Sequence, residues 1–261
     1  MTAEDNIHEQ LKQYSHFLSE YAICLQASGV HTTRVVRNTC RIASALGVNV
    51  EMTILHKTLN LTLSTHDGQH VYDKVSTIHP RPVSFRLNAD LSALSWQAYD
   101  EHLGLNELWR RYNAILAALR LNDWVVLSLV GVANAAFCGL FGGDIWACVV
   151  VAVATWVGYC MKLLMVRKHM NTYGIWFSCA LVSSLIASLC GFLHLGQTPD
   201  IAIATGALYL VPGVPLINSV IDTVEGHVLA GFARLIDALL LIGCLSVGLL
   251  CTMLLVGQIA W

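Results

Sequence analysis

Continuous apolarity from residue 124 onward is the feature that most constrains this chain. Hydrophobic stretches follow one another there, and most reach about 20 residues, enough for a helix to cross roughly 30 Å of hydrocarbon. The sequence therefore predicts an α-helical polytopic membrane protein with five transmembrane helices. The expected spans lie near residues 124–143, 145–166, 173–195, 201–217 and 235–257.

Charged residues divide the chain into two parts of different polarity. They make up 12% of the sequence, about half of the roughly 25% typical of soluble domains. We therefore predict a soluble domain at 1–120 and a transmembrane domain at 121–261. The net charge of −2 gives no reason to expect a nucleic-acid partner. Only four of the 15 Lys and Arg residues lie in the transmembrane part: Lys162, Arg167, Lys168 and Arg234.

Residues 1–120 show the periodicities of both helices and strands. Apolar residues recur first at steps of three and four, which is typical of amphipathic helices. The period then becomes two around an Asp67-Gly68 turn, which is typical of antiparallel strands. We therefore predict an α+β domain. The expected helices lie at 5–27, 31–46, about 90–102 and 105–120, and the expected strands at 48–54, 59–63 and 71–78.

Basic residues alternate between the segments that connect the expected spans. Three of these segments carry Lys or Arg, and the other three carry neither. Because basic residues accumulate on the cytoplasmic side of a membrane, we expect a cytosolic N-terminal domain and a C-terminus outside. The basic segments contain Arg110, Arg111 and Arg120 before the first span, Arg167 and Lys168 after the second, and Arg234 after the fourth.

The segment LYLVPGVPLINSVIDTVEGHVLAGFAR is the strongest candidate for a functional site. Pro212, Gly213 and Pro215 interrupt an apolar run there, and each proline is expected to break the helix. Broken backbone at membrane depth is tolerated only where it is buried in protein or lines a wet cavity. Interrupted spans mark substrate sites in transporters, whereas a kink or a simple interfacial exit is the alternative. Asn218 and Asp222 share one helical face beside the break.

Other polar residues in the expected spans are further candidates for substrate binding or coupling. Asp237 lies one turn into the last span, where a carboxylate faces a partner, a cavity or nearby solvent. Lys162 lies near a cytosolic end and can extend its amine to the interface. Asn134 lies among small residues, which favours helix packing over substrate contact. Glu225 and His227 are expected in a cytosolic loop.

The sequence predicts neither catalysis nor a bound cofactor or metal. It contains no nucleophile elbow, Walker loop or dinucleotide fingerprint, so we expect a protein that is not an enzyme. It also contains no CxxC or CxxH pair. A metal site around the hairpin is conceivable from His66, His70, Asp73 and His79. However, nothing in the sequence fixes a third ligand, and a polar turn explains these residues adequately.

Two stretches of the sequence resemble the bacterial threonine/serine exporters. CLQASGVHTTRVVRNTCRIASALGV is similar to the helix–Gly–helix part of that family's soluble domain. LVPGVPLINSVIDTVEGHVLAGFARL resembles its PG-x-P-x-x-N-x-x-x-D segment, which ends in G-x-A-R. The resemblance covers nearly the whole chain and implies a secondary exporter of the bacterial inner membrane. It implies as core positions Pro212, Gly213, Pro215, Asn218, Asp222, Gly231 and Arg234.

The resemblance also implies a partner and a class of cargo. Some family members fuse a five-span half and its soluble domain to a smaller membrane half, whereas others divide the two between separate proteins. This chain resembles the larger subunit of the divided type, so a smaller membrane subunit is the implied partner, and self-association stays open. The likeness favours a C4 dicarboxylate such as succinate as cargo. Threonine or serine export, and an accessory or sensing subunit, are the alternatives.

The topology can be tested with a reporter protein fused after Trp261. Because an odd number of spans follows a cytosolic N-terminal domain, we expect this reporter outside the cytoplasm. The measurement is the activity of a reporter that works on one side of the membrane only. A cytosolic reporter at this position would overturn the predicted orientation.

Overall fold

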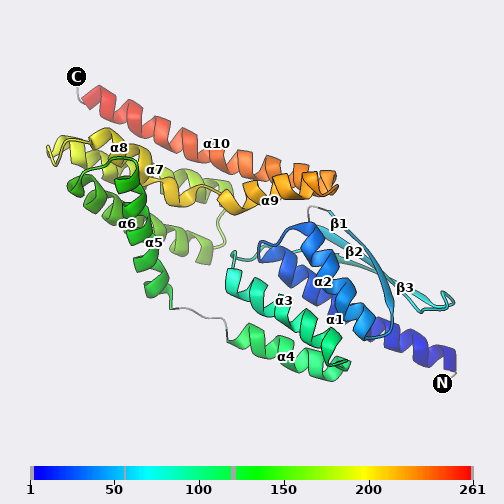
Figure 1. The fold of residues 1–261 in the computed structure, drawn as a ribbon. Helices are drawn as coiled ribbons and strands as arrows, with labels where there is room; N and C mark the ends of the chain where they lie inside the picture. The colour runs from blue at the N-terminus through cyan, green and yellow to red at the C-terminus, as the bar shows by residue number, and fades with distance from the viewer. Residues whose placement is uncertain (1–2, 56, 119–121, 260–261) are drawn as a thin grey trace. The chain divides into compact units, whose positions relative to one another are not determined.

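The computed structural model describes residues 3–55, 57–118 and 122–259, and it divides into two compact units (Figure 1). The first unit combines Met1–Arg120 with Gly213–Ile236, and the second combines Leu121–Pro212 with Asp237–Trp261. The predicted domain boundary after Arg120 lies outside the described residues, as does the C-terminal Trp261.

Four helices of the first unit come from the N-terminal part of the chain: α1 (Ala3–Ala27), α2 (Thr32–Ala45), α3 (Phe85–Asp100) and α4 (Leu105–Ala117). Helix α3 begins earlier than the predicted residue 90. Ser84 explains the difference, because its side chain accepts a hydrogen bond from the Leu87 amide and so caps the helix.

The predicted antiparallel sheet is confirmed, with strands β1 (Asn49–Ile54), β2 (Thr58–Ser64) and β3 (Val71–Thr77) in that order. The alternating leucines of β2 all point into the core, where each is at most 1% exposed. Burying a leucine side chain stabilises a fold by about 1.5–3 kcal/mol. These leucines are Leu59, Leu61 and Leu63.

The first unit is layered, with helices packed on one face of the sheet. Helix α1 contacts β2 and β3, α2 contacts β1, and α3 packs in turn against α2 (Figure 1). The Tyr21 hydroxyl donates a 2.8 Å hydrogen bond to the Leu91 carbonyl, which ties α1 to α3. Burial raises the pKa of Tyr21, so the phenol stays protonated at neutral pH. The predicted α+β fold is therefore confirmed.

The predicted polytopic membrane part is confirmed as well. Four helices are long and apolar enough to cross a membrane, and a fifth crossing is counted if α8 (Pro199–Gly206), the 3₁₀ turn η1 (Leu208–Leu210) and α9 (Gly213–Val224) form one broken span. The four helices are α5 (Asp123–Leu140), α6 (Ile145–Arg167), α7 (Thr172–Phe192) and α10 (Val228–Ile259).

Small residues let the helices of the second unit approach one another closely. A Cβ atom added at Gly158 would clash with the side chains of Ser183 and Tyr209. One added at Gly248 would lie 2.9 Å from the Phe177 carbonyl oxygen of α7. Since lipid supplies no hydrophobic drive for helix association, such close packing holds membrane helices together.

Helix α10 begins at Val228, earlier than the span expected from residue 235. The preceding sequence VLAGFAR contains no proline, and leucine, alanine and arginine favour helix. Gly231 is required there, because an added Cβ would lie 2.7 Å from the Ser219 carbonyl oxygen of α9. The helix therefore continues upstream of the most apolar residues that a hydropathy window detects.

The turn between α1 and α2 depends on Gly29, whose φ angle is +93°. This left-handed conformation costs little only for glycine. A Cβ atom at Gly29 would also lie 3.0 Å from Cγ2 of Val83. Gly47, which follows α2, has a φ angle of +73° but no atom within 4 Å of an added Cβ.

These two glycines provide a matched test of the turn. Gly47→Ala is expected to destabilise the chain only through backbone strain, by about 1–2 kcal/mol. Gly29→Ala adds the contact with Val83 and should lower the thermal unfolding midpoint further. The measurement is the midpoint of each full-length variant in the same detergent. Equal midpoints would show that Val83 can move away from the added methyl group without a loss of stability.

Candidate functional site

Three of the predicted site residues converge on the turn between α1 and α2. Asn218 on α9 donates a 2.9 Å hydrogen bond from Nδ2 to the Gly29 carbonyl. Arg234 on α10 donates a 3.0 Å hydrogen bond from Nη2 to the Val30 carbonyl. Asp222, one turn after Asn218, accepts hydrogen bonds from the residue that begins α2. All of these residues belong to the first unit.

The carboxylate of Asp222 caps the N-terminus of α2. Its Oδ1 accepts a 2.6 Å hydrogen bond from the Thr32 amide, and its Oδ2 accepts a 3.1 Å hydrogen bond from the Thr32 hydroxyl. His31, at the N-cap position itself, makes no side-chain capping hydrogen bond. Asp222 therefore satisfies a free amide of the helix and places negative charge at the positive end of its dipole.

Asp222 and Arg234 also form a buried ion pair. Nε of Arg234 lies 3.4 Å from Oδ2 of Asp222, and the two side chains are 17% and 0% exposed. Burying either charge alone would be costly, whereas hydrogen bonds to both partners offset the loss of water. The pair and the cap together fix α9 and the start of α10 against the α1–α2 turn.

Glu225 and His227 lie in the connection between α9 and α10, so the predicted loop is present. Its cytosolic side stays a prediction. An Oε2 atom of Glu225 lies 3.0 Å from Nδ1 of His31. Thr33 and His31 stabilise the carboxylate and so hold the pKa of Glu225 below its usual range.

His31, Asp222 and Glu225 form a cluster that the sequence interpretation missed. One potential ligand atom from each lies within 4.8 Å of the others, close enough to hold a metal ion. However, both Asp222 oxygens already accept hydrogen bonds from Thr32, and Arg234 neutralises the carboxylate. The contacts of these residues therefore describe an ion-pair and hydrogen-bond network rather than a metal site. Elsewhere in the described ranges, the histidines of the hairpin join no comparable cluster.

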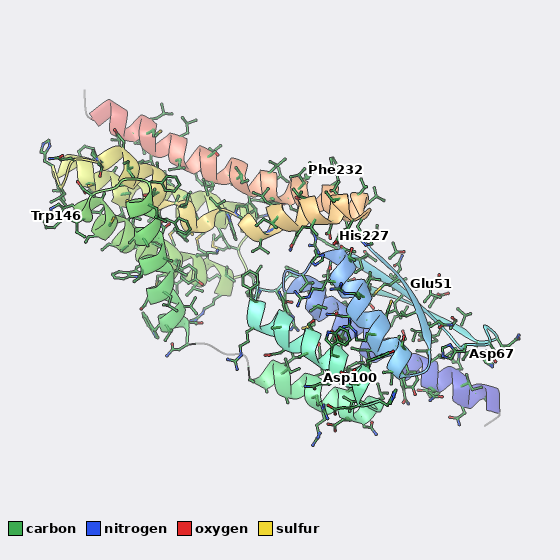
Figure 2. The ribbon with its side chains drawn as sticks, viewed as in Figure 1. Glu51, Asp67, Asp100, Trp146, His227 and Phe232 are labelled. Carbon is green, nitrogen blue, oxygen red and sulfur yellow. The ribbon has the colours of Figure 1, made fainter. Side chains whose placement is uncertain are left out.

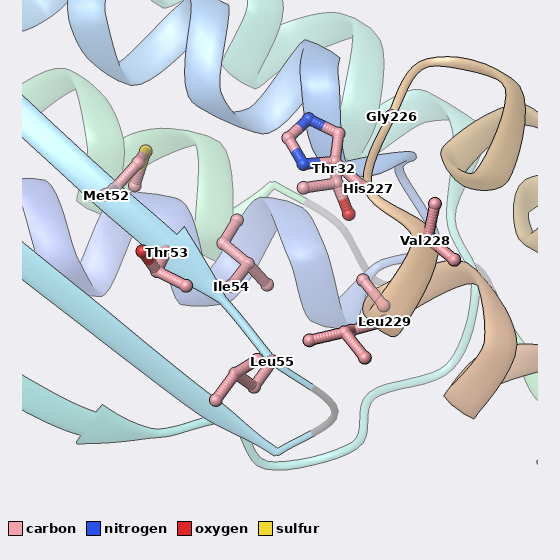
Figure 3. Close-up of a pocket in the computed structure, with 10 residues that line it drawn as sticks. Thr32, Met52, Thr53, Ile54, Leu55, Gly226, His227, Val228 and Leu229 are labelled. Atoms are coloured by element: carbon pink, nitrogen blue, oxygen red, sulfur yellow. The ribbon is translucent and has the colours of Figure 1, made fainter.

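Two pockets of the first unit border this network. One has a volume of about 260 Å³ and is lined by Thr32, the end of β1 (Met52–Leu55) and the residues around His227 (Figure 3). The other has a volume of about 250 Å³ and lies between the α1–α2 turn, the start of α3 and Asn218. Both pockets are small compared with the roughly 300–1,000 Å³ of sites for drug-sized ligands.

The predicted helix break is present at the start of α9. The helix resumes at Gly213 after Val211 and Pro212, which lie outside regular helix. Pro215 lies in the first turn of α9, where a missing backbone donor costs little. The break therefore separates α9 from η1, as the proline spacing predicts.

The remaining predicted site residues lie in the second unit. Asn134 is buried and donates from Nδ2 to the Thr155 hydroxyl at 2.6 Å and to the Thr205 carbonyl at 3.1 Å. It thus joins α5 to α6 and α8, as expected of a residue in helix packing. Lys162 is half-buried, with Nζ 4.3 Å from the centroid of the Trp176 ring. Asp237 is half-buried on α10, one turn after Arg234.

Comparisons with known proteins give a consistent family assignment. Residues 16–256 match the family model described as "Putative threonine/serine exporter". The chain is 28% identical over 258 residues to "Probable succinate transporter subunit YjjP" of Escherichia coli, covering 97% of this chain and 98% of that protein. It is also 28% identical over 242 residues to the protein of the same name from Klebsiella aerogenes, covering 92% and 93%.

A third relative matches only part of the chain. "Probable threonine/serine exporter" of Mycobacterium tuberculosis is 34% identical over 111 residues, which cover 42% of this chain and 21% of that protein. No solved structure matches the chain.

The importance of the buried pair can be tested by Asp222→Asn. This change leaves the Arg234 guanidinium buried without its counter-charge, and we expect a loss of about 3–5 kcal/mol in stability. Glu225→Gln is the matched control, because its pair with His31 is more exposed and its loss should change stability much less. The measurement is the unfolding midpoint of the full-length chain. If both variants unfold alike, Asp222 does not hold the unit together.

Proposed function

The chain belongs to the threonine/serine exporter family, and we propose that it is one subunit of a two-component secondary exporter. Its cargo in this proposal is a small carboxylate metabolite, with a C4 dicarboxylate such as succinate favoured. The observation that carries the proposal is the match over nearly the full length of relatives named as succinate transporter subunits. The membrane helices and the exporter family match support transport.

A partner follows from the same comparison. The relatives are named as subunits, which supports a complex with a second integral membrane protein. We propose that this partner is a smaller member of the same family and that the complex lies in the bacterial inner membrane. In the proposed orientation the N-terminus is cytosolic and the C-terminus lies outside.

The choice of cargo rests on charge as well as on resemblance. A carboxylate group is attracted to cations, and Lys162 and Arg234 are the candidates from the predicted site. Arg234 is already paired with Asp222, whereas Lys162 lies over an aromatic ring. Threonine or serine is the alternative cargo, supported by the family description and the mycobacterial relative. An amino acid would also need a carboxylate for its ammonium group, and Asp237 could supply one.

We propose that the segment from Pro212 to Asp222 couples the helix break to the α1–α2 turn. Pro212, Gly213 and Pro215 break the helix, and Asn218 and Asp222 then bind the α1–α2 turn. A movement of α9 during transport would therefore act directly on the α1–α2 turn. Since motion is transmitted by rigid contacts between packed elements, this network is suited to that task.

An accessory or sensing subunit is the second candidate function. The observation that favours it is the direction of the motif side chains, which contact the α+β fold of the first unit. In that case the partner alone would move the cargo, and this chain would adjust its activity. The side-chain amide of Asn134 donates two hydrogen bonds to neighbouring helices, and Asn134 would then have a structural role only.

The proposal can be tested by efflux from loaded cells. Cells that lack both genes are given this chain, the partner or both, and are loaded with labelled succinate, threonine or serine. We expect succinate efflux only when both proteins are present. The measurement is the rate at which label leaves the cells.

Two results would contradict this. Succinate efflux by the partner alone would favour an accessory subunit. Efflux of threonine or serine but not succinate by the pair would overturn the proposed cargo while leaving the two-component exporter in place.

A further inference from the structure

The second pocket of the first unit is lined by both polar and apolar residues. It is bounded by the α1–α2 turn, the first turn of α2, the start of α3 and α9. Its volume of about 250 Å³ suits a metabolite smaller than a drug-sized molecule. The polar residues that line it are His31, Arg34, Asn88 and Asn218.

Arg34 is the unexplained charge in this pocket. It is half-buried, yet among the described residues it has no hydrogen bond or ion pair. The other half-buried arginines of the described ranges are all bound: Arg41 to Asn38 and Ser95, Arg111 to Glu101 and Glu107, and Arg234 to Asp222. A guanidinium that loses part of its water without a protein partner is available for an anion.

The position of Arg34 in the helix also indicates that this arginine is available for an anion. It lies in the first turn of α2, where the helix dipole disfavours a positive charge. Stability of the helix therefore does not explain an arginine there. Asp222 already offsets the helix dipole at this end, so an anion in the pocket would be favoured mainly by the Arg34 guanidinium.

The neighbouring groups leave donors free for such an anion. His31 uses Nδ1 for Glu225. A neutral ring that donates from Nδ1 has only an acceptor at Nε2, so His31 is not one of these donors. Asn218 and Asn88 each donate one N–H of the side-chain amide, to the carbonyls of Gly29 and Ser28, and keep a second N–H.

The nearby carboxylates limit the charge of the ligand. Glu225 is bound to His31 beside the pocket, and Asp222 lies at the start of α2. A doubly charged phosphate would place both of its charges beside these carboxylates. Succinate also carries two charges, but they lie on separate carboxylate groups, so only one charge need approach Arg34.

We propose that this pocket binds the carboxylate group of a small metabolite, with Arg34 as its main anchor. The guanidinium forms two parallel hydrogen bonds to the carboxylate, which matches its fork geometry. The inference deepens the proposed function, on which the choice of succinate as probe rests. The site itself is argued from the pocket and the unpaired arginine.

Binding of labelled succinate to the purified full-length chain, without its partner, tests the site. Charge-assisted hydrogen bonds contribute enough that Arg34→Gln should weaken binding about tenfold or more. Arg34→Lys keeps the charge but loses the fork, and should bind with intermediate affinity. Arg37→Gln is the matched control, because Arg37 lies on the same helix, is exposed and does not line the pocket. The thermal midpoint of each variant checks that it is folded.

Three outcomes would overturn the site: no succinate binding by the unmodified chain, equal binding by the folded Arg34→Gln variant, or equal loss in the Arg37→Gln control. Displacement of succinate by inorganic phosphate at lower concentration than by acetate would overturn the carboxylate class. A different result would contradict the transport proposal while leaving the site in place. Binding that depends on Arg34, together with no succinate efflux by the complete pair, would uphold the site and reject the proposed cargo.

Discussion

The first unit depends on one buried interaction, in which the Asp222 carboxylate meets both the start of α2 and the Arg234 guanidinium. Asp222 and Thr32 are 190 positions apart in the sequence. Neither charge could be buried alone without a large loss of hydration free energy, so each requires the other. The need to satisfy these charges brings the C-terminal part of the chain into the N-terminal α+β fold.

Helix α9 is consequently polar on the side that contacts protein and apolar on the other. Asn218, Ser219 and Asp222 are buried, whereas Ile217, Val220 and Val224 are each more than 60% exposed. On α10, Phe232 is exposed as well (Figure 2). A globular protein in water normally has the opposite arrangement, with apolar residues inside. Here the exposed apolar side suits a lipid environment, as expected if α9 forms part of a broken span.

Local patterns in the sequence were sufficient for most of the fold. Alternation of Leu59, Leu61 and Leu63 identified the central strand, and the prolines identified the break before α9. The four-residue spacing of Asn218 and Asp222 correctly placed both on one face. Their partner could not be predicted, because a contact between residues so far apart leaves no periodic signal in either segment. The pocket around Arg34 was missed for the same reason.

The contacts of Asn218, Asp222 and Arg234 with the α1–α2 turn are made largely to main-chain atoms: the Gly29 and Val30 carbonyls and the Thr32 amide. Main-chain atoms are the same in every amino acid. Related proteins can therefore exchange the outward-facing side chains of this turn during evolution and still keep the junction, provided that the glycine conformation is retained. Such a turn allows side chains to diverge between relatives while the junction stays constant.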